Sequence, residues 1–129
     1  MPQTNRETPD RISDAEHAVM EVLWDRAPLS AADVCKAVCD QRDWSLATVK
    51  TLLSRLVTKQ AVATEPDGRR FLYRPAIERT DYVGGESRRL VDRLFGGRAA
   101  PLFAQLADSE ALTERDLDEI ETLLKELRK

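Results

Sequence analysis

Apolar side chains recur at intervals of three and four residues along three successive stretches of the first half of the chain. This spacing places them on one face of a helix and predicts three amphipathic helices, at about 14–26, 31–41 and 45–60. A short linker between the second and third helices is typical of a helix-turn-helix. The positions expected to be buried are Ala15, Val19, Met20, Leu23 and Trp24 in the first helix, Ala31, Val34, Cys35 and Val38 in the second, and Leu46, Val49, Leu52, Leu53, Leu56 and Val57 in the third.

An alternating segment follows the third helix and is divided by Asp67-Gly68. Because glycine readily adopts the positive φ of a tight turn, residues 62–75 are predicted to form a β-hairpin that turns at Asp67-Gly68. Leu29, between the first two helices, is expected as a single strand residue. The three helices and the hairpin predict a winged helix-turn-helix domain over residues 13–76, preceded by a flexible N-terminal tail over residues 1–12.

The remaining residues, 77–129, are again helical in pattern, so the expected fold class is mainly α with a small β-hairpin. About 50 residues rarely enclose a core of their own, so we expect this region to form a helical dimer interface; packing back onto the first domain is the alternative. Helices are expected from Thr80 or Asp81 to Phe95, over about 99–107, and from the N-cap Thr113 to about 128. The residues expected at the interface are Leu90, Leu94, Leu106, Leu117, Ile120, Leu124 and Leu127.

The net charge of −3 would argue against binding to nucleic acid, but the charges are distributed unevenly along the chain. Residues 7–43 hold four Lys/Arg and nine Asp/Glu, whereas residues 44–75 hold six Lys/Arg and two Asp/Glu. Phosphate binding depends on the field within a Debye length, about 8–10 Å, and not on the total charge. Residues 44–75 are therefore predicted to bind double-stranded DNA.

The polar face of the third helix supplies the candidate contacts. It carries threonines and cations, and no acidic residue lies between Ser45 and Gln60. Hydroxyls and guanidinium groups can reach base edges, and the other cations can bind phosphates and fix the register. The candidates from this pattern are Thr48, Lys50, Thr51, Arg55 and Lys59 on the helix and Arg69 and Arg70 on the hairpin.

Other classes of site find little support in the sequence. One histidine, no Cys–His pairing and no Gly-rich phosphate loop exclude a recognisable enzyme, and no cofactor or metal site is expected. Cys35 and Cys39 are expected as small core residues without a disulfide, and His17 as a surface residue without a role. No apolar run approaches the ~20 residues of a membrane helix, and the N-terminus lacks a signal-peptide core, so a cytoplasmic location is expected.

Several motifs in order resemble the penicillinase-repressor family (the BlaI/MecI/CopY repressors). They are Ile12-Ser-Asp-Ala-Glu16, Val19-Met20, Leu23-Trp24, Trp44-Ser45, Thr48-Val-Lys-Thr-Leu-Leu-Ser-Arg-Leu56, Gly68-Arg-Arg-Phe-Leu-Tyr-Arg-Pro75 and Asp81-Tyr82. The resemblance implies a homodimeric winged-helix repressor that binds an operator dyad, in the best-known members before β-lactam-resistance genes. By position, it implies Ser45, Thr48, Thr51 and Arg55 as the DNA-reading residues.

The resemblance also implies relief of repression by a membrane sensor-protease that cleaves near Gln105-Leu106. The chain differs from the best-known members at Leu46-Ala47 and Lys50, on or beside the DNA face, so the operator sequence stays open. It lacks the C-terminal cysteine cluster of the copper-responsive branch. Two alternatives also stay open: a winged-helix protein–protein assembly module, and a redox- or ligand-responsive winged-helix regulator.

Overall fold

The computed structural model describes residues 11–129, and the chain divides into two compact units, Met1–Tyr82 and Val83–Lys129. Residues 1–10 of the expected N-terminal tail lie outside the described part. The last two residues of that expected tail contact the first unit. Ile12 packs against its core, and the carbonyl of Arg11 accepts a hydrogen bond from Lys59 Nζ at 2.7 Å.

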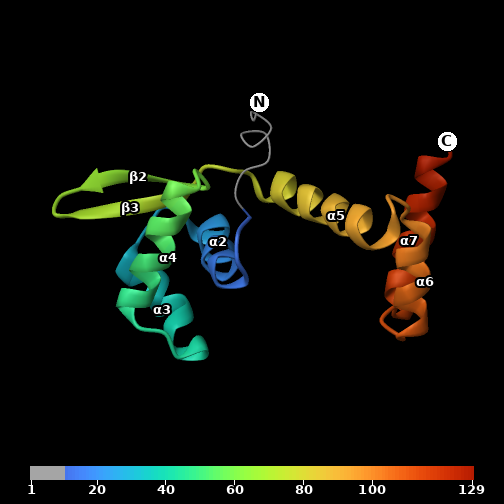
Figure 1. The fold of residues 1–129 in the computed structure, drawn as a ribbon, viewed down its shortest axis with the longest axis horizontal. Coiled ribbons are helices and arrows are strands. Elements are labelled where there is room, and N and C mark those ends of the chain that lie inside the picture. Colours follow the sequence, from blue (N-terminus) through green and yellow to red (C-terminus); the bar gives the residue numbers. More distant parts are fainter. Residues whose placement is uncertain (1–10) are drawn as a thin grey trace. The chain divides into compact units, whose positions relative to one another are not determined.

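Three helices form the body of the first unit (Figure 1). They are α2 (Asp14–Arg26), α3 (Ala31–Arg42) and α4 (Leu46–Thr58), within two residues of the predicted bounds. Ser13 and Glu16 form a capping box at the start of α2. The side chains of Ser30 and Ser45 accept the backbone N–H groups of the first turns of α3 and α4. Each cap satisfies a donor that the helix itself cannot pair, which is why the helices begin at these residues.

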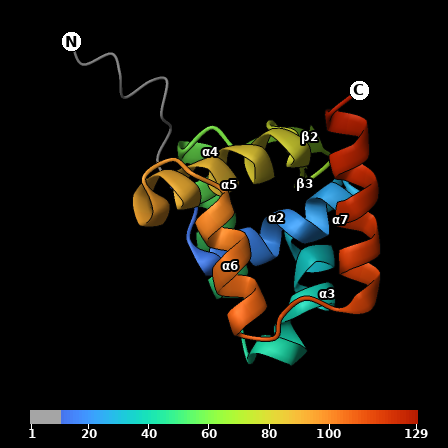
Figure 2. The ribbon, with the colours of Figure 1, turned by 90° about the vertical axis from the view of Figure 1, so that its right-hand side faces the viewer.

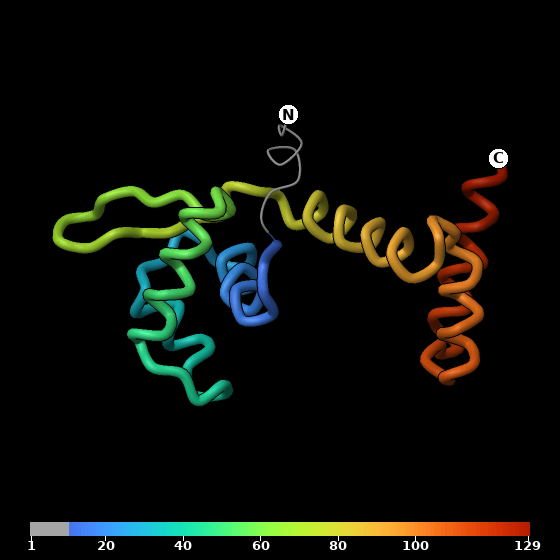
Figure 3. Tube along the Cα trace, in the orientation of Figure 1, coloured from blue at the N-terminus to red at the C-terminus, as the bar shows by residue number. Residues whose placement is uncertain are grey.

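A three-stranded antiparallel sheet completes the first unit, in the order β1 (Leu29–Ser30), β3 (Arg70–Pro75), β2 (Val62–Asp67). The predicted strand residue Leu29 pairs with Tyr73. β2 and β3 run side by side out to the turn (Figure 3). Because Asp67 pairs with Arg70, the turn residues are Gly68 and Arg69, one position later than predicted. Gly68 has the expected positive φ, +66°.

The core of the first unit joins one face of each helix to the base of the hairpin. Trp44 and Tyr73 pack against it as anchors. Two predicted core residues are wrong: Leu46 is 39% exposed and Val57 is 37% exposed. Leu46 is the first residue of α4, and Val57 lies at the edge of the apolar stripe beside Leu56. The buried hydrophobic residues are Val19, Met20, Leu23, Ala31, Val34, Val38, Cys39, Val49, Leu52, Leu53, Leu56, Ala61 and Val62.

Three further helices follow: α5 (Arg79–Phe95), α6 (Ala100–Asp108) and α7 (Glu114–Leu127). α5 begins earlier than predicted because the N–H of Tyr82 bonds to the carbonyl of Glu78 at 3.0 Å. It ends at Gly96 and Gly97, which have φ of +60° and +87°. α6 and α7 run in opposite directions (Figure 2). α7 begins at the predicted N-cap Thr113, which forms a capping box with Asp116. No residue of α5, α6 or α7 is buried.

Candidate nucleic-acid interface

The hydroxyl groups of α4 are held by local hydrogen bonds. Ser45 Oγ accepts the N–H of Thr48 at 3.2 Å and lies 3.2 Å from Thr48 Oγ1. Thr51 Oγ1 donates to the carbonyl of Ala47 at 3.1 Å. A hydroxyl that donates once still has lone pairs to accept a further hydrogen bond. These bonds fix the side-chain rotamers of the first two turns and leave acceptors available at the surface.

Two cations on α4 are exposed and free of competing acids. Within residues 11–129, neither Lys50 nor Arg55 forms an ion pair, and the first turn of α4 has no acidic residue. The N–H groups at the start of a helix add a partial positive charge, here at the N-terminal end of α4. The exposed face of α4 therefore attracts anions.

The wing continues this basic surface. Arg69, at the turn, is exposed and forms no ion pair within the described residues, and Arg70 Nε lies 3.0 Å from Asp67 Oδ2. Arg74 pairs with Glu65 on the neighbouring strand. Exposed ion pairs contribute only about 0–1 kcal/mol, so Arg70 can exchange its carboxylate for a phosphate at little cost.

Lys59 differs from the other predicted DNA contacts. Its Nζ lies 2.6 Å from Oε1 of Glu16, a side chain that is only 2% exposed. Burial alone would raise the pKa of Glu16, but hydrogen bonds from Lys59 and from the N–H of Ser13 outweigh it and hold the pKa below its ordinary value. Lys59 is thus committed to an intramolecular ion pair, and we do not place it in the interface.

The turn between α3 and α4 contains a contact that sequence analysis missed. The guanidinium of Arg42 lies over the ring of Trp44, 5.2 Å from its centroid. Asp43 between them has a φ of 57°, in the left-handed region. A cation over an indole ring is a favourable arrangement. The Arg-x-Trp spacing was the available signal, and the contact helps to define the direction in which the chain enters α4.

The two cysteines contradict the expectation of free thiols. Cys35 and Cys39 are joined by a disulfide within α3, with their Cα atoms 4.9 Å apart. Cys39 is 8% exposed, and Cys35 is partly buried against the core. The physical reason is their spacing of four, which places both side chains on one face of the helix one turn apart. The expectation of free thiols rested on a reducing cytoplasm, whereas the structure joins the two sulfur atoms.

The described part of the chain contains neither a metal-binding cluster nor a membrane-spanning helix. Among residues 11–129, no three or more His, Cys, Asp or Glu side chains gather in a way that could hold a metal ion. In the same range, no helix is both long enough and apolar enough to cross a bilayer.

Comparison with known proteins gives the family. The family model described as "Penicillinase repressor" matches residues 12–126. The chain belongs to the penicillinase-repressor family. It is 30% identical to the penicillinase repressor of Bacillus licheniformis over 116 residues, which cover 90% of this chain and 91% of that protein. It is 28% identical to the methicillin resistance regulatory protein MecI of Mammaliicoccus sciuri, over 88% of this chain and 92% of that one.

Solved structures confirm the winged-helix fold of this penicillinase-repressor family member. The DNA-binding domain of the repressor BlaI is 39% identical and aligns with a TM-score of 0.51, covering 56% of this chain and 88% of that one. Monomeric Bacillus licheniformis BlaI, in complex with the blaP half-operator, is 38% identical, with a TM-score of 0.50 and coverage of 57% and 89%. Escherichia coli MarR in its oxidised form, at 21% identity and a TM-score of 0.50, shares the fold over 92% of this chain and 76% of that one.

Proposed function

We propose that this chain is a homodimeric transcriptional repressor that binds an operator dyad through α4 and the β2–β3 wing. The observation that carries the proposal is a set of exposed cations, Lys50, Arg55 and Arg69, within the basic stretch of an acidic chain. None of the three forms an ion pair with another residue of the described range 11–129. The complex of BlaI with its half-operator, a protein 38% identical to this chain, supports DNA as the partner.

In this proposal α4 enters the major groove. Ser45, Thr48 and Thr51 offer hydroxyl acceptors to base edges, and the two threonines also offer methyl groups. Arg55 reaches a guanine or a phosphate. The remaining cations fix the register by binding phosphates: Lys50 on α4 and Arg69 and Arg70 on the wing. Occupation of the operator then excludes the transcription machinery.

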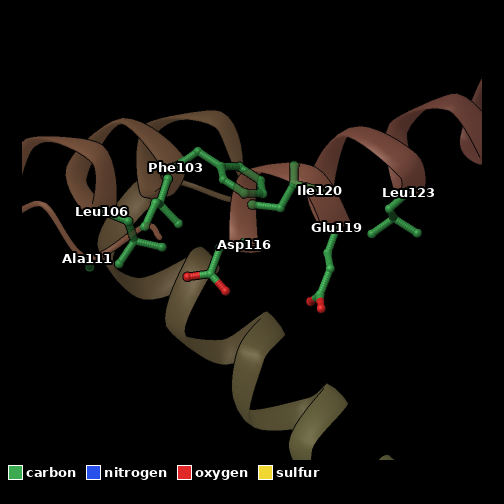
Figure 4. Close-up of a pocket in the computed structure, with 8 residues that line it drawn as sticks. Phe103, Leu106, Ala111, Asp116, Glu119, Ile120 and Leu123 are labelled. Carbon is green, nitrogen blue, oxygen red and sulfur yellow. The ribbon is translucent and has the colours of Figure 1, made fainter. Parts of the chain in front are cut away.

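The proposed dimer uses the C-terminal helices. Leu117 is 46% exposed, Leu124 48% and Leu127 72%, all on α7. Beside them lies a pocket of about 470 Å³ whose apolar side chains gather together, with the carboxylates of two acidic residues next to them (Figure 4). Its lining residues are Phe103, Leu106, Ala111, Leu112, Asp116, Glu119, Ile120 and Leu123. An exposed apolar face of this kind is stabilised by a second copy, and a two-fold dimer matches a palindromic site.

The proposed release mechanism is cleavage in the C-terminal region near Gln105-Leu106, by a membrane sensor-protease. This peptide lies inside α6, a short helix without a side-chain N-cap. Short helices are marginal alone, so α6 can unfold locally to present an extended peptide. Co-expression with a membrane sensor-protease of a family relative, followed by mass spectrometry of the fragments, tests the site. Fragments ending elsewhere would reject this position.

Footprinting on the region upstream of the protein's own gene tests the core of the proposal. We expect protection of a dyad and an affinity that falls steeply with salt, because cations that neutralise phosphates release counterions. The triple variant Lys50→Ala, Arg55→Ala, Arg69→Ala should fold normally and lose the footprint. Equal protection by this variant would reject these three cations as the DNA contacts. Absence of any footprint with the wild type would instead favour the alternative of an assembly module, in which the winged helix contacts protein and not DNA. The neighbouring genes would also show whether a β-lactam-resistance gene is regulated.

A further inference from the structure

The first turn of α5 is fixed to α2 by contacts that all lie within the first unit. Glu21 accepts hydrogen bonds from Arg79 Nε and Nη2 at 3.0 and 3.2 Å. The indole Nε1 of Trp24 donates to the carbonyl of Ile77 at 3.0 Å. The ring of Tyr82 lies against that of Trp24, with centroids 5.7 Å apart. The start of α5 therefore moves together with the winged-helix unit.

His17 belongs to the same group of contacts, although sequence analysis gave it no role. Its ring stacks on Tyr82 with centroids 5.5 Å apart, and its Nε2 lies 3.0 Å from Glu21 Oε2. The hydrogen bond from Arg79, more than the nearby histidine, holds the pKa of Glu21 below its ordinary value. One carboxylate, that of Glu21, thus contacts both Arg79 and His17.

Two glycines follow this fixed turn directly. Gly84 and Gly85 lie inside α5, just after the boundary between the two units at Tyr82 and Val83. A Cβ at either position would meet no atom within 4 Å, and neither has the positive φ of Gly68 at the wing turn. Neither packing nor backbone conformation therefore requires glycine here. Each glycine makes a helix about four- to five-fold less favourable than alanine would.

We propose that Gly84 and Gly85 form a hinge that determines which half-site spacings the repressor accepts. The inference rests on the proposed function of a dimer on an operator dyad. Each base pair added between two half-sites rotates one against the other by about 34°. A dimer with a stiff α5 fits one spacing. If α5 bends at Gly84 and Gly85, each winged-helix unit can rotate to the orientation that its half-site requires.

The first test needs no DNA. In the full-length protein, Gly84→Ala/Gly85→Ala should slow hydrogen exchange of the amides at 84–88 by roughly ten-fold, because alanine raises the helical population at both positions. Ser87→Ala is the matched control. Ser87 is exposed on the same helix, and its replacement changes the helix propensity of α5 while Gly84 and Gly85 stay in place. We expect it to change exchange little. Equal exchange in the wild type and the double variant would overturn the hinge.

The second test measures spacing. Half-sites recovered by selection from a random duplex pool are placed in pairs, with the gap varied one base pair at a time across a helical turn of about 10–10.5 base pairs. We expect the wild type to stay within roughly ten-fold of its best affinity over several neighbouring spacings. The double variant should keep one spacing and lose more than ten-fold at the others. Binding to a single half-site should be the same for both proteins.

The outcomes separate the hinge from the function on which it rests. Sedimentation velocity first establishes that the wild type and both variants have the same oligomeric state. Superimposable spacing profiles, with binding intact, would reject the hinge and leave the repressor in place. Failure of the wild type to select or bind any duplex would reject the repressor function and, with it, the role of the two glycines in spacing.

Discussion

Lys59 Nζ lies 2.6 Å from Oε1 of Glu16 and 2.7 Å from the carbonyl of Arg11. The ion pair joins the first turn of α2 to the C-cap of α4, which are separated by 43 positions in the sequence. Glu16 is 2% exposed and also completes the capping box with Ser13. One carboxylate thus begins one helix and fixes the end of the helix that we propose to read DNA.

Removal of the ammonium should destabilise the first unit. Lys59→Ala leaves the buried Glu16 carboxylate without its cation, and breaking a buried pair from one side costs about 3–5 kcal/mol. We expect a value near 3 kcal/mol, because the Lys59 side chain is still 21% exposed. Urea denaturation followed by circular dichroism measures it. Lys50→Ala, which removes an unpaired cation from the same helix, is the control and should leave the midpoint unchanged.

The same ion pair makes stability depend on pH. The pKa of Glu16 is lower in the folded protein than in the unfolded chain, so its contribution is full above the ordinary glutamate pKa of about 4.3 and is lost as pH falls through the folded pKa. The free energy of unfolding should therefore decrease from about pH 5 downward. Glu16→Gln should show a shallower decrease in this window, with a residual slope from Glu21. Parallel curves for the two proteins would rule out the contribution of Glu16.

Lys59 also forms a contact that the sequence did not predict, its ion pair with Glu16. The periodicity of α4 placed four of its six predicted core positions correctly, all except Leu46 and Val57, because this signal is local. Whether a cation at the end of α4 faces solvent or a carboxylate on α2 depends on how two distant segments pack. No local pattern reports that packing, so Lys59 was predicted as a phosphate contact.

Arg55 is an exposed cation on α4 that forms no ion pair within residues 11–129. Arg55→Ala should weaken operator binding by about 1–3 kcal/mol and reduce the salt slope by about one unit if the guanidinium binds a phosphate. A contact to guanine would instead relax the preference for one base. Gel-shift titrations at several salt concentrations separate these results. Arg93→Ala, an exposed arginine of α5, is the control, and equal losses for both variants would contradict a specific role for Arg55.

The disulfide in α3 gives a prediction about the cysteines themselves. Alkylation under denaturing conditions without reductant should leave Cys35 and Cys39 unmodified, as measured by mass spectrometry. Reduction should lower the free energy of unfolding by at most about 2 kcal/mol, since the closed loop is very short. The variant Cys35→Ser/Cys39→Ser should be insensitive to reductant. Rapid alkylation of both thiols in the protein as isolated would show that the bond is absent.

The sequence predicted the helix α5, but it did not predict the contacts that attach the start of α5 to α2. The helical pattern predicted most of α5. The contacts of Glu21 with Arg79 and of Trp24 with Ile77 connect segments more than 50 positions apart, one through charges and the other through a backbone carbonyl. Neither contact produces a periodic pattern in the sequence. Three-dimensional proximity was required to show that His17, a lone histidine, stacks on Tyr82.

The exposed leucines of α7 predict a self-association that one charge can break. Leu124 is 48% exposed, so Leu124→Asp buries no charge in the monomer and should leave the helix content and the unfolding midpoint nearly unchanged. In a dimer interface the same carboxylate would lose water without gaining a partner, which costs several kcal/mol. Sedimentation velocity should then show monomer at concentrations where the wild type is dimeric. Operator affinity should fall, while binding to an isolated half-site should be unchanged. Thr122→Asp, about 200° around the helix, is the matched control and should stay dimeric. A dimer that survives Leu124→Asp would place the interface elsewhere.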